Sequence, residues 1–370
     1  MRKGWKQHMQ SVVNREDLSD DLKKEIVTAL EFMAVRFGED FIKTCKGDHP
    51  LFQRISGHTS EFLRFYQALM QIERSDGNLD FLVKEKLIPY ADCWQEGMVF
   101  VEVAQSLMNA GLKARFIEEN NEAKSPDIEV VNPANKNRLF IEITKVGESV
   151  ERKRKSQSYH RLFPVFHNAP VLPFSCKVLS PIPDEEFPNL INKIKGLKSE
   201  ARDLNKMMIY SDCNINLAIA SPQCRDELIR WANENNSGEC DLVGLPVNFE
   251  DTLRIRDNKL KKKAKQIPDG MVGILYVEVS PLYFFVTDLT KAIEELESRL
   301  HSISNLFGVV LFSFIGNMPE EKLARDGMHF YSKRMLTKTL TRDLFFVHNS
   351  KCEYSVDDDT MKKLYSSFLI

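Results

Sequence analysis

The chain lacks the features that mark several large protein classes. None of its apolar runs approaches the roughly 20 residues that a membrane-spanning helix needs. Its seven cysteines form no CxxC pair, so zinc-site spacing is missing and reduced thiols are expected. It has no glycine-rich phosphate loop and no serine–histidine–aspartate nucleophile motif. These absences argue against a membrane protein, a zinc-finger protein, an ATPase or helicase, and a serine hydrolase.

An excess of charge of one sign is also missing. The chain has 51 lysines and arginines against 53 aspartates and glutamates, a formal net charge of -2. This balance argues against a generally basic nucleic-acid-binding protein. It still permits a local basic groove, because electrostatic steering depends on where the charges lie. The start of the sequence has no apolar signal core, so a cytoplasmic protein is expected.

With 370 residues, the chain is long enough for one large or two ordinary domains. Residues 1–90 have helical periodicity, whereas helices and short apolar strands alternate from there on. The apolar runs 272–279 and 308–315 are separated by an amphipathic segment, which indicates buried strands joined by a crossover helix. The sequence therefore predicts an α/β fold, with a helical accessory domain over 1–90 and an α/β domain over 91–370.

Between residues 148 and 266, the predicted helices and strands alternate less regularly. The expected elements are a helix over 148–162, an extended region over 168–180, a helix over 184–204, a strand over 207–219, a helix over 222–235, strands over 240–255 and a basic helix over 257–266. A last strand is expected around 345–347 and a last helix over 357–368.

Two acidic residues stand out on neighbouring short strands. Asp127 follows a proline and opens one predicted strand, and Glu142 lies inside the next. The turn between them, 132–137, is rich in turn-forming residues and predicts a hairpin. Such a hairpin can bring both carboxylates to one edge, where their oxygens suit a hard divalent cation. Taken singly, Asp127 is as typical of the start of a turn, and Glu142 is as typical of the solvent-facing side of an alternating strand.

Together with the helix before them, these residues resemble the PD-(D/E)XK nuclease superfamily, which includes many restriction-type endonucleases. The resemblance covers about residues 95–160, the αβββα core of that family. Asp127 and Glu142 match the two acids of the motif, and Glu102 sits where many members carry a glutamate on the core helix. The resemblance implies a restriction-endonuclease-like mixed sheet flanked by helices. It also implies Mg²⁺ or Mn²⁺ as cofactor, with Asp127, Glu142 and Glu102 as ligands.

The third position of the motif departs from the family pattern. Members usually carry a lysine two residues after the second acid, where this chain has Thr144, and Lys145 follows one residue later. Because side chains alternate along a strand, Thr144 should share a face with Glu142 while Lys145 points away. A β-bulge could bring Lys145 round, or the Thr144 hydroxyl could hold a water or phosphate. Alternatively a lysine from elsewhere supplies the charge, such as Lys124, Lys153 or Lys155.

Two local runs of positive charge offer contacts to phosphate groups. The first follows the second acid and contains Arg152, Lys153, Arg154 and Lys155. The second lies over 254–265 and contains Lys259, Lys262 and Lys263. The second run is also typical of a solvated helix surface. Phosphate contacts give affinity without sequence choice, and neither run belongs to a helix-turn-helix, zinc-finger or RNA-binding signature.

The resemblance implies a metal-dependent nuclease, an endonuclease that acts on DNA rather than RNA. No association with a membrane is expected. Residues 91–370 would form the nuclease domain with a C-terminal α/β extension. The resemblance favours a role against foreign DNA in a bacterial cell, with a homo-oligomer or an added ATPase or defence subunit left open. Thr144 motivates an alternative: a catalytically inactive nuclease-like module that binds nucleic acid or a partner protein within a defence or toxin complex.

Overall fold

The computed structural model describes most of the chain. The described residues are 4–44, 49, 51, 59–89, 91–118, 125–147, 149–236, 238, 240–241, 243–244, 249–280, 283, 289–313 and 343–369. Within these ranges, no helix combines the length and apolar character that crossing a membrane requires.

Every element described before the first strand is a helix, as residues 1–90 predicted. The elements are α1 (Trp5–Val13), α2 (Asp20–Phe37), α3 (Phe41–Thr44), α5 (Thr59–Arg74), α6 (Leu79–Phe81), the π-helix η1 (Leu82–Leu87) and α7 (Ala91–Asn109). Helix α2 begins where the Ser19 side chain accepts a hydrogen bond from the backbone N–H of Leu22, and it ends at Gly38, whose φ is 91°. Both are common ways of satisfying the unpaired backbone groups at helix ends.

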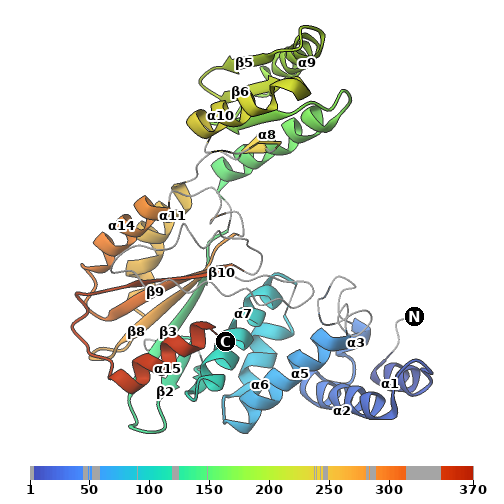
Figure 1. Cartoon of the computed structure of the whole chain (residues 1–370). Coiled ribbons are helices and arrows are strands. Elements are labelled where there is room, and N and C mark those ends of the chain that lie inside the picture. The colour runs from blue at the N-terminus through green and yellow to red at the C-terminus, as the bar shows by residue number, and fades with distance from the viewer. Residues whose placement is uncertain are drawn as a thin grey trace.

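A six-stranded mixed sheet lies at the centre of the main body (Figure 1). Its strands are β1 (Lys113–Phe116), β2 (Ile128–Val131), β3 (Arg138–Lys145), β8 (Gly273–Glu278), β9 (Leu306–Ser313) and β10 (Asp343–His348), in that spatial order. Strand β2 pairs antiparallel with both β1 and β3. Strand β8 pairs parallel with both β3 and β9, and β10 pairs antiparallel with β9. Helix α14 (Leu289–Leu300) connects β8 to β9, so the predicted crossover is confirmed.

The two faces of this sheet are covered by different helices. Along β3, Leu139, Ile141 and Ile143 join an apolar cluster with α7 and with α15 (Asp358–Leu369). Phe140 joins a second cluster with the basic helix, which consists of the π-helical η3 (Ile255–Leu260) and α12 (Lys261–Ala264). Figure 1 shows α14 and α11 on one side of the sheet and α7 and α15 on the other. We call these the basic-helix face and the α7 face.

The helices of residues 1–90 pack into the core on the α7 face. One continuous apolar cluster runs from Trp5 of α1 through Phe65 of α5 and Phe100 of α7 to Ile141 of β3 and Phe368 of α15. Residue 90 therefore separates segments that share a core, and the accessory domain stays a prediction from sequence.

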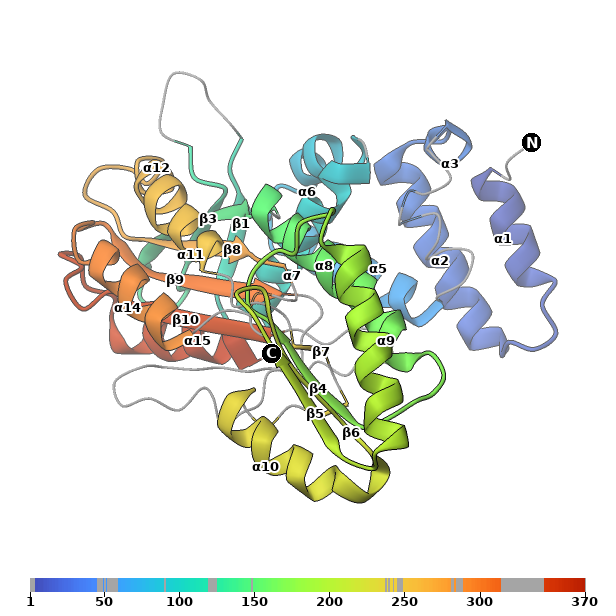
Figure 2. The ribbon, with the colours of Figure 1, turned by 90° about the horizontal axis from the view of Figure 1, so that it is seen from above.

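The segment between β3 and β8, which we call the inserted unit (149–249), builds a second sheet. Its elements are α8 (Val150–His167), β4 (Phe174–Val178), α9 (Phe187–Asp203), β5 (Met207–Ser211), β6 (Ile215–Ala220), the 3₁₀ turn Pro222–Cys224, α10 (Arg225–Asn235) and β7 (Val243–Gly244). The strand order is β5-β6-β4-β7. Helices α8 and α9 cover one face, and α10 lies against the other. Figures 1 and 2 show the inserted unit projecting from the main body.

The inserted unit leaves and rejoins the main body at one place. The Ser149 hydroxyl donates a hydrogen bond to Glu250 (2.7 Å), and the Arg254 guanidinium donates one to the backbone oxygen of Gly147 (2.6 Å). These contacts join the outgoing and returning segments directly after β3. The insertion therefore leaves the parallel pairing of β3 with β8 intact.

Two predictions for this segment are wrong. Residues 207–219, expected as one strand, form the hairpin β5–β6, because the Asp212 carboxylate accepts hydrogen bonds from the backbone N–H groups of Asn214 and Ile215 and turns the chain. Residues 240–255 are predicted as strands, but among the described residues of this range the one strand is β7, and α11 (Glu250–Arg254) is a helix. Its first turn carries two acids, which favour a helix N-terminus.

Candidate metal-binding and catalytic site

The hairpin β2–β3 brings the two predicted acids to one face of the sheet. Its register pairs Ile128 with Ile141, so extending the antiparallel pairing by one residue sets Asp127 opposite Glu142. Residues directly opposed in this way project to the same face, here the basic-helix face. The Asp127 carboxylate also accepts a hydrogen bond from the backbone N–H of Ile143 at 2.6 Å. Asp127 is therefore held against β3 beside Glu142.

Glu142 is buried and carries a close counter-charge. Only 1% of its surface is exposed, and its Oε2 lies 2.8 Å from Nζ of Lys263 in α12. The Lys263 side chain keeps 26% of its surface exposed. A buried carboxylate is costly unless it is paired and hydrogen-bonded, and the contact with Lys263 supplies such a partner. The basic-helix face thus contains an acidic pair with a lysine already in contact with it.

Thr144 and Lys145 lie on opposite faces of β3. Thr144 is buried two residues beyond Glu142 on the same face, while exposed Lys145 forms an ion pair with Glu278, its register partner on β8, at 3.5 Å. Pairing of β3 with β8 runs in regular steps from Phe140 to Lys145, so the proposed β-bulge is not formed. The expectation that Lys145 points away is confirmed. Strand alternation directs Lys145 to the α7 face, away from Glu142, so the role on the phosphate side that a bulge would have given it has no support in this register.

Lys263 is the lysine that sequence reasoning did not assign to the acids. The sequence predicts it, with Lys259 and Lys262, as a phosphate contact, and of these Lys262 is exposed. The helical positions around it gave a partial signal. Leu260, Ala264 and Ile267 are buried against the sheet, so a helical wheel sets Lys263 beside the buried stripe. Its pairing with Glu142 spans 121 positions and leaves no trace in local spacing.

Glu102 comes from the other side of the sheet. It is half-buried on α7, between Val101 and Val103, and α7 packs on the face that bears Ile141 and Ile143. Among the residues that the structure describes, no group of three or more histidines, cysteines, aspartates or glutamates is arranged to hold a metal ion. The three-carboxylate ligand set therefore stays a prediction.

The residues present nevertheless suit a divalent cation. Asp127 and Glu142 offer hard oxygen donors on one face, and Mg²⁺ needs only one or two carboxylates because it keeps several waters. The ion pair between Lys263 and Glu142 places one positive charge beside this carboxylate.

The first basic run lies on α8, at the start of the inserted unit. Lys153 and Arg154 are exposed there, whereas the side chains of Arg152 and Lys155, like all of Lys124, lie outside the described residues. Arg154 helps to line a cavity of about 420 Å³ that also contains Arg161, Asp184 and Glu185. Because acidic and basic side chains both line this cavity, it does not offer phosphate a purely basic surface.

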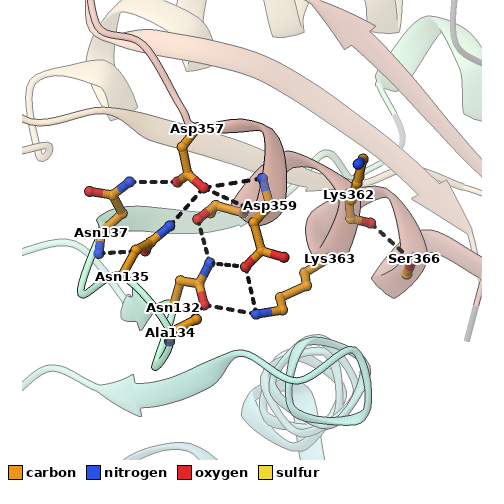
Figure 3. Close-up of polar contacts among 10 residues, drawn as sticks. Asn132, Ala134, Asn135, Asn137, Asp357, Asp359, Lys362, Lys363 and Ser366 are labelled. Atoms are coloured by element: carbon orange, nitrogen blue, oxygen red, sulfur yellow. Dashed lines mark hydrogen bonds and ion pairs between the residues drawn. The ribbon is translucent and has the colours of Figure 1, made fainter.

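A polar cluster fastens the hairpin turn to the C-terminal helix (Figure 3). Asn132 is fully buried and donates hydrogen bonds to Asp359 and Thr360, both at 2.8 Å, while Lys363 donates one to it at 2.9 Å. Asp357 accepts hydrogen bonds from the side chains of Asn135 and Asn137 and from the backbone of α15. The hairpin that carries both acids is therefore anchored at its far end.

Asp357 makes this anchor sensitive to acid. Burial alone would raise the pKa of Asp357, but hydrogen bonds from Thr360, Asn137 and Asn135 outweigh it and hold that pKa far below its ordinary value. The stabilisation is then fully present above the unfolded-state pKa of about 4 and is lost as pH falls through the lower folded-state pKa. We expect Asp357→Asn to be less stable than wild type at neutral pH and to lose less stability on acidification.

Urea unfolding at neutral pH and at about pH 3 measures both effects. Asp358→Asn, which changes an exposed neighbour in the same turn, is the matched control and should follow the wild-type profile. Parallel pH profiles for wild type and Asp357→Asn would contradict the assignment.

Comparisons with known proteins found no relative of this chain. The chain matches no protein-family profile, no curated protein and no solved structure. Its function is accordingly inferred from the acids, the lysine and their setting in the fold.

Proposed function

We propose that this protein is a metal-dependent nuclease of the PD-(D/E)XK type in which Lys263 takes the part of the missing motif lysine. The observation that carries the proposal is the 2.8 Å contact between Lys263 and buried Glu142, on the sheet face that Asp127 shares. An acidic pair with a lysine beside it is the minimum that phosphodiester hydrolysis by this chemistry needs.

The order of elements supports the same proposal. Helix α7 is followed by the antiparallel strands β1, β2 and β3, and then by the basic helix and the parallel strand β8. The order α7, β1, β2, β3 is the first part of the αβββα core that the resemblance implies over 95–160; the helix that follows, α8, belongs to the inserted unit, and the basic helix packs on the sheet instead. A restriction-endonuclease-like core is thus part of the proposal.

The residues have separate chemical roles in this proposal. Asp127 and Glu142 would bind Mg²⁺ or Mn²⁺, which supplies Lewis acidity and a water of lowered pKa. The Lys263 ammonium donates to Glu142 and carries a full positive charge beside the acidic pair. Its charge would stabilise negative charge that develops on the phosphate. Thr144, on the same face, adds a neutral hydroxyl.

The proposed substrate is DNA, and the proposed setting is defence against foreign DNA in bacteria. Both follow from the family resemblance. Exposed Lys262 on the basic helix and exposed Lys153 and Arg154 on α8 would add phosphate contacts, which raise affinity without choosing a sequence.

A cleavage assay tests the function. Plasmid DNA, single-stranded DNA and RNA are incubated with the full chain and Mg²⁺, Mn²⁺ or a chelator. We expect metal-dependent cutting of DNA by wild type and loss of cutting in Asp127→Ala and Glu142→Ala. Glu129→Ala is the matched control, because Glu129 lies on the same strand face but pairs with Arg138 at 3.3 Å. Equal cutting by wild type and both site variants would sink the proposal.

Thr144 favours a second candidate, a nuclease-like module that binds without cutting. A threonine contributes a hydrogen bond where a lysine contributes charge. This candidate predicts nucleic-acid or protein binding that survives Asp127→Ala, with no cleavage under any metal. A subunit that acts only within a complex would instead begin to cut when its partner is added.

A further inference from the structure

The strand β5 is an edge strand without the usual protection. It ends the order of the inserted sheet, and within the described residues it pairs only with β6. Edge strands are commonly protected by charged residues, prolines or bulges. Strand β1, an edge of the larger sheet, carries exposed Lys113 and Arg115, whereas β5 reads Met-Met-Ile-Tyr-Ser. Figure 1 shows β5 on the side of the inserted unit farthest from the main body.

The hydrogen bonds at the two ends of the β5–β6 hairpin show which backbone groups face outward. The N–H of Ser221 donates to the oxygen of Lys206 at 3.2 Å, and the N–H of Asp212 donates to the oxygen of Ile215 at 2.9 Å. Bonded pairs alternate along an antiparallel ladder, so residues 208 and 210 bond toward β6. Residues 207, 209 and 211 then direct their N–H and C=O groups away from the sheet.

Apolar surface accompanies these backbone groups. Ile209 is 51% exposed in the middle of β5, and Leu204 is 57% exposed just before it. Among the described residues, seven of the ten exposed large hydrophobic side chains belong to the inserted unit: Val150, Phe163, Val171, Leu179, Leu204, Ile209 and Ile229. Scattered apolar residues are ordinary on a surface, but here one lies on an open strand edge.

We propose that β5 pairs antiparallel with β5 of a second copy of this chain, about a two-fold axis at Ile209. The outward-facing residues then meet each other, with Ile209 opposite Ile209 and Met207 opposite Ser211. In the same register Lys206 of each copy lies opposite Asp212 of the other, so unlike charges close both ends of the pairing. A two-fold interface uses one patch twice, and this strand is self-complementary in backbone and charge.

The pairing would join two inserted sheets into one continuous sheet of eight strands. Both main bodies, each with its acidic pair and Lys263, would lie outward from the axis. The inference does not depend on nuclease activity.

Light scattering after size-exclusion chromatography, over a wide range of concentration, tests the dimer. We expect the full chain to approach twice its 42.7 kDa at high concentration, and Ile209→Lys to remain at the mass of one chain. Ile229→Lys is the matched control, because Ile229 is 38% exposed on α10 of the same unit and lies off the edge. It should dimerise like wild type, and both variants should retain the wild-type unfolding temperature.

Oxidative cross-linking tests the register. Opposed residues of a bonded antiparallel pair have Cα atoms about 5.5 Å apart, within disulfide range. Ile209→Cys should therefore cross-link above the level of wild type, which already has seven cysteines, while Ser211→Cys should not, because Met207 faces it. A wild-type monomer at every concentration would overturn the proposal, since the edge would then be open or covered by something else. A dimer that persists in Ile209→Lys, or equal cross-linking at 209 and 211, would overturn it as well.

Discussion

Lys263→Met is expected to lower metal-dependent DNA cleavage by ~100–1000-fold, the usual loss when one preorganised stabilising group is removed from an active site. Methionine keeps much of the length and the packing of the lysine stem while it removes the charge. Since Lys263 lies 2.8 Å from Glu142, its loss should act at the reacting phosphate rather than only on binding. Initial rates at saturating and at limiting DNA, with Mg²⁺ in excess, separate these two contributions.

Two neighbouring lysines provide matched controls. Lys145→Met removes the lysine nearest to the motif in sequence, but Lys145 lies on the α7 face and pairs with Glu278, so cleavage should change little. Lys262→Met removes an exposed charge from the same helix as Lys263 and should weaken binding without slowing the saturated rate. If Lys145→Met abolished cleavage and Lys263→Met did not, the assignment of the lysine would be reversed.

Lys263→Met is also expected to unfold more easily than wild type when metal is absent. Removing one partner of a buried ion pair costs about 3–5 kcal/mol. The Lys263 side chain is 26% exposed, so solvent screens part of the interaction and we expect about 2 kcal/mol. Mg²⁺ should recover much of this loss in Lys263→Met, because a bound cation would again balance the Glu142 charge. Wild type, whose Glu142 already has a cation, should gain less.

Urea unfolding with a chelator and with Mg²⁺ measures this effect for wild type, Lys263→Met, Glu142→Gln and the double variant. The double variant removes both charges and should be more stable in chelator than Lys263→Met alone. Lys145→Met, which breaks a partly exposed pair, should cost no more than about 1 kcal/mol and should not respond to metal. Additive losses in the double variant would show that Lys263 and Glu142 are not coupled.

Local pattern was sufficient to predict much of what surrounds the site. Within residues 1–90, predicted to be helical, α5 forms over Thr59–Arg74, because apolar spacing specifies a helix locally. The turn 132–137 predicted the β2–β3 hairpin that sets the two acids opposite each other. Strand alternation also separated Thr144 from Lys145 correctly, since the period of two holds wherever a strand has no bulge.

Only the tertiary structure decided which residues lie beside the two acids. Lys263 reaches Glu142 because the chain returns from the inserted unit as a helix that packs across β3, and no local period encodes that return. The anchoring of the hairpin turn by Asp357 likewise joins segments more than 200 positions apart. The turn at Asp212 and the edge position of β5 were also missed, because strand pairing depends on topology rather than composition. The sequence by itself determined most elements of the main body and the hairpin that carries the two acids, because these depend on local pattern, whereas long-range packing determined the lysine, the anchor and the open edge.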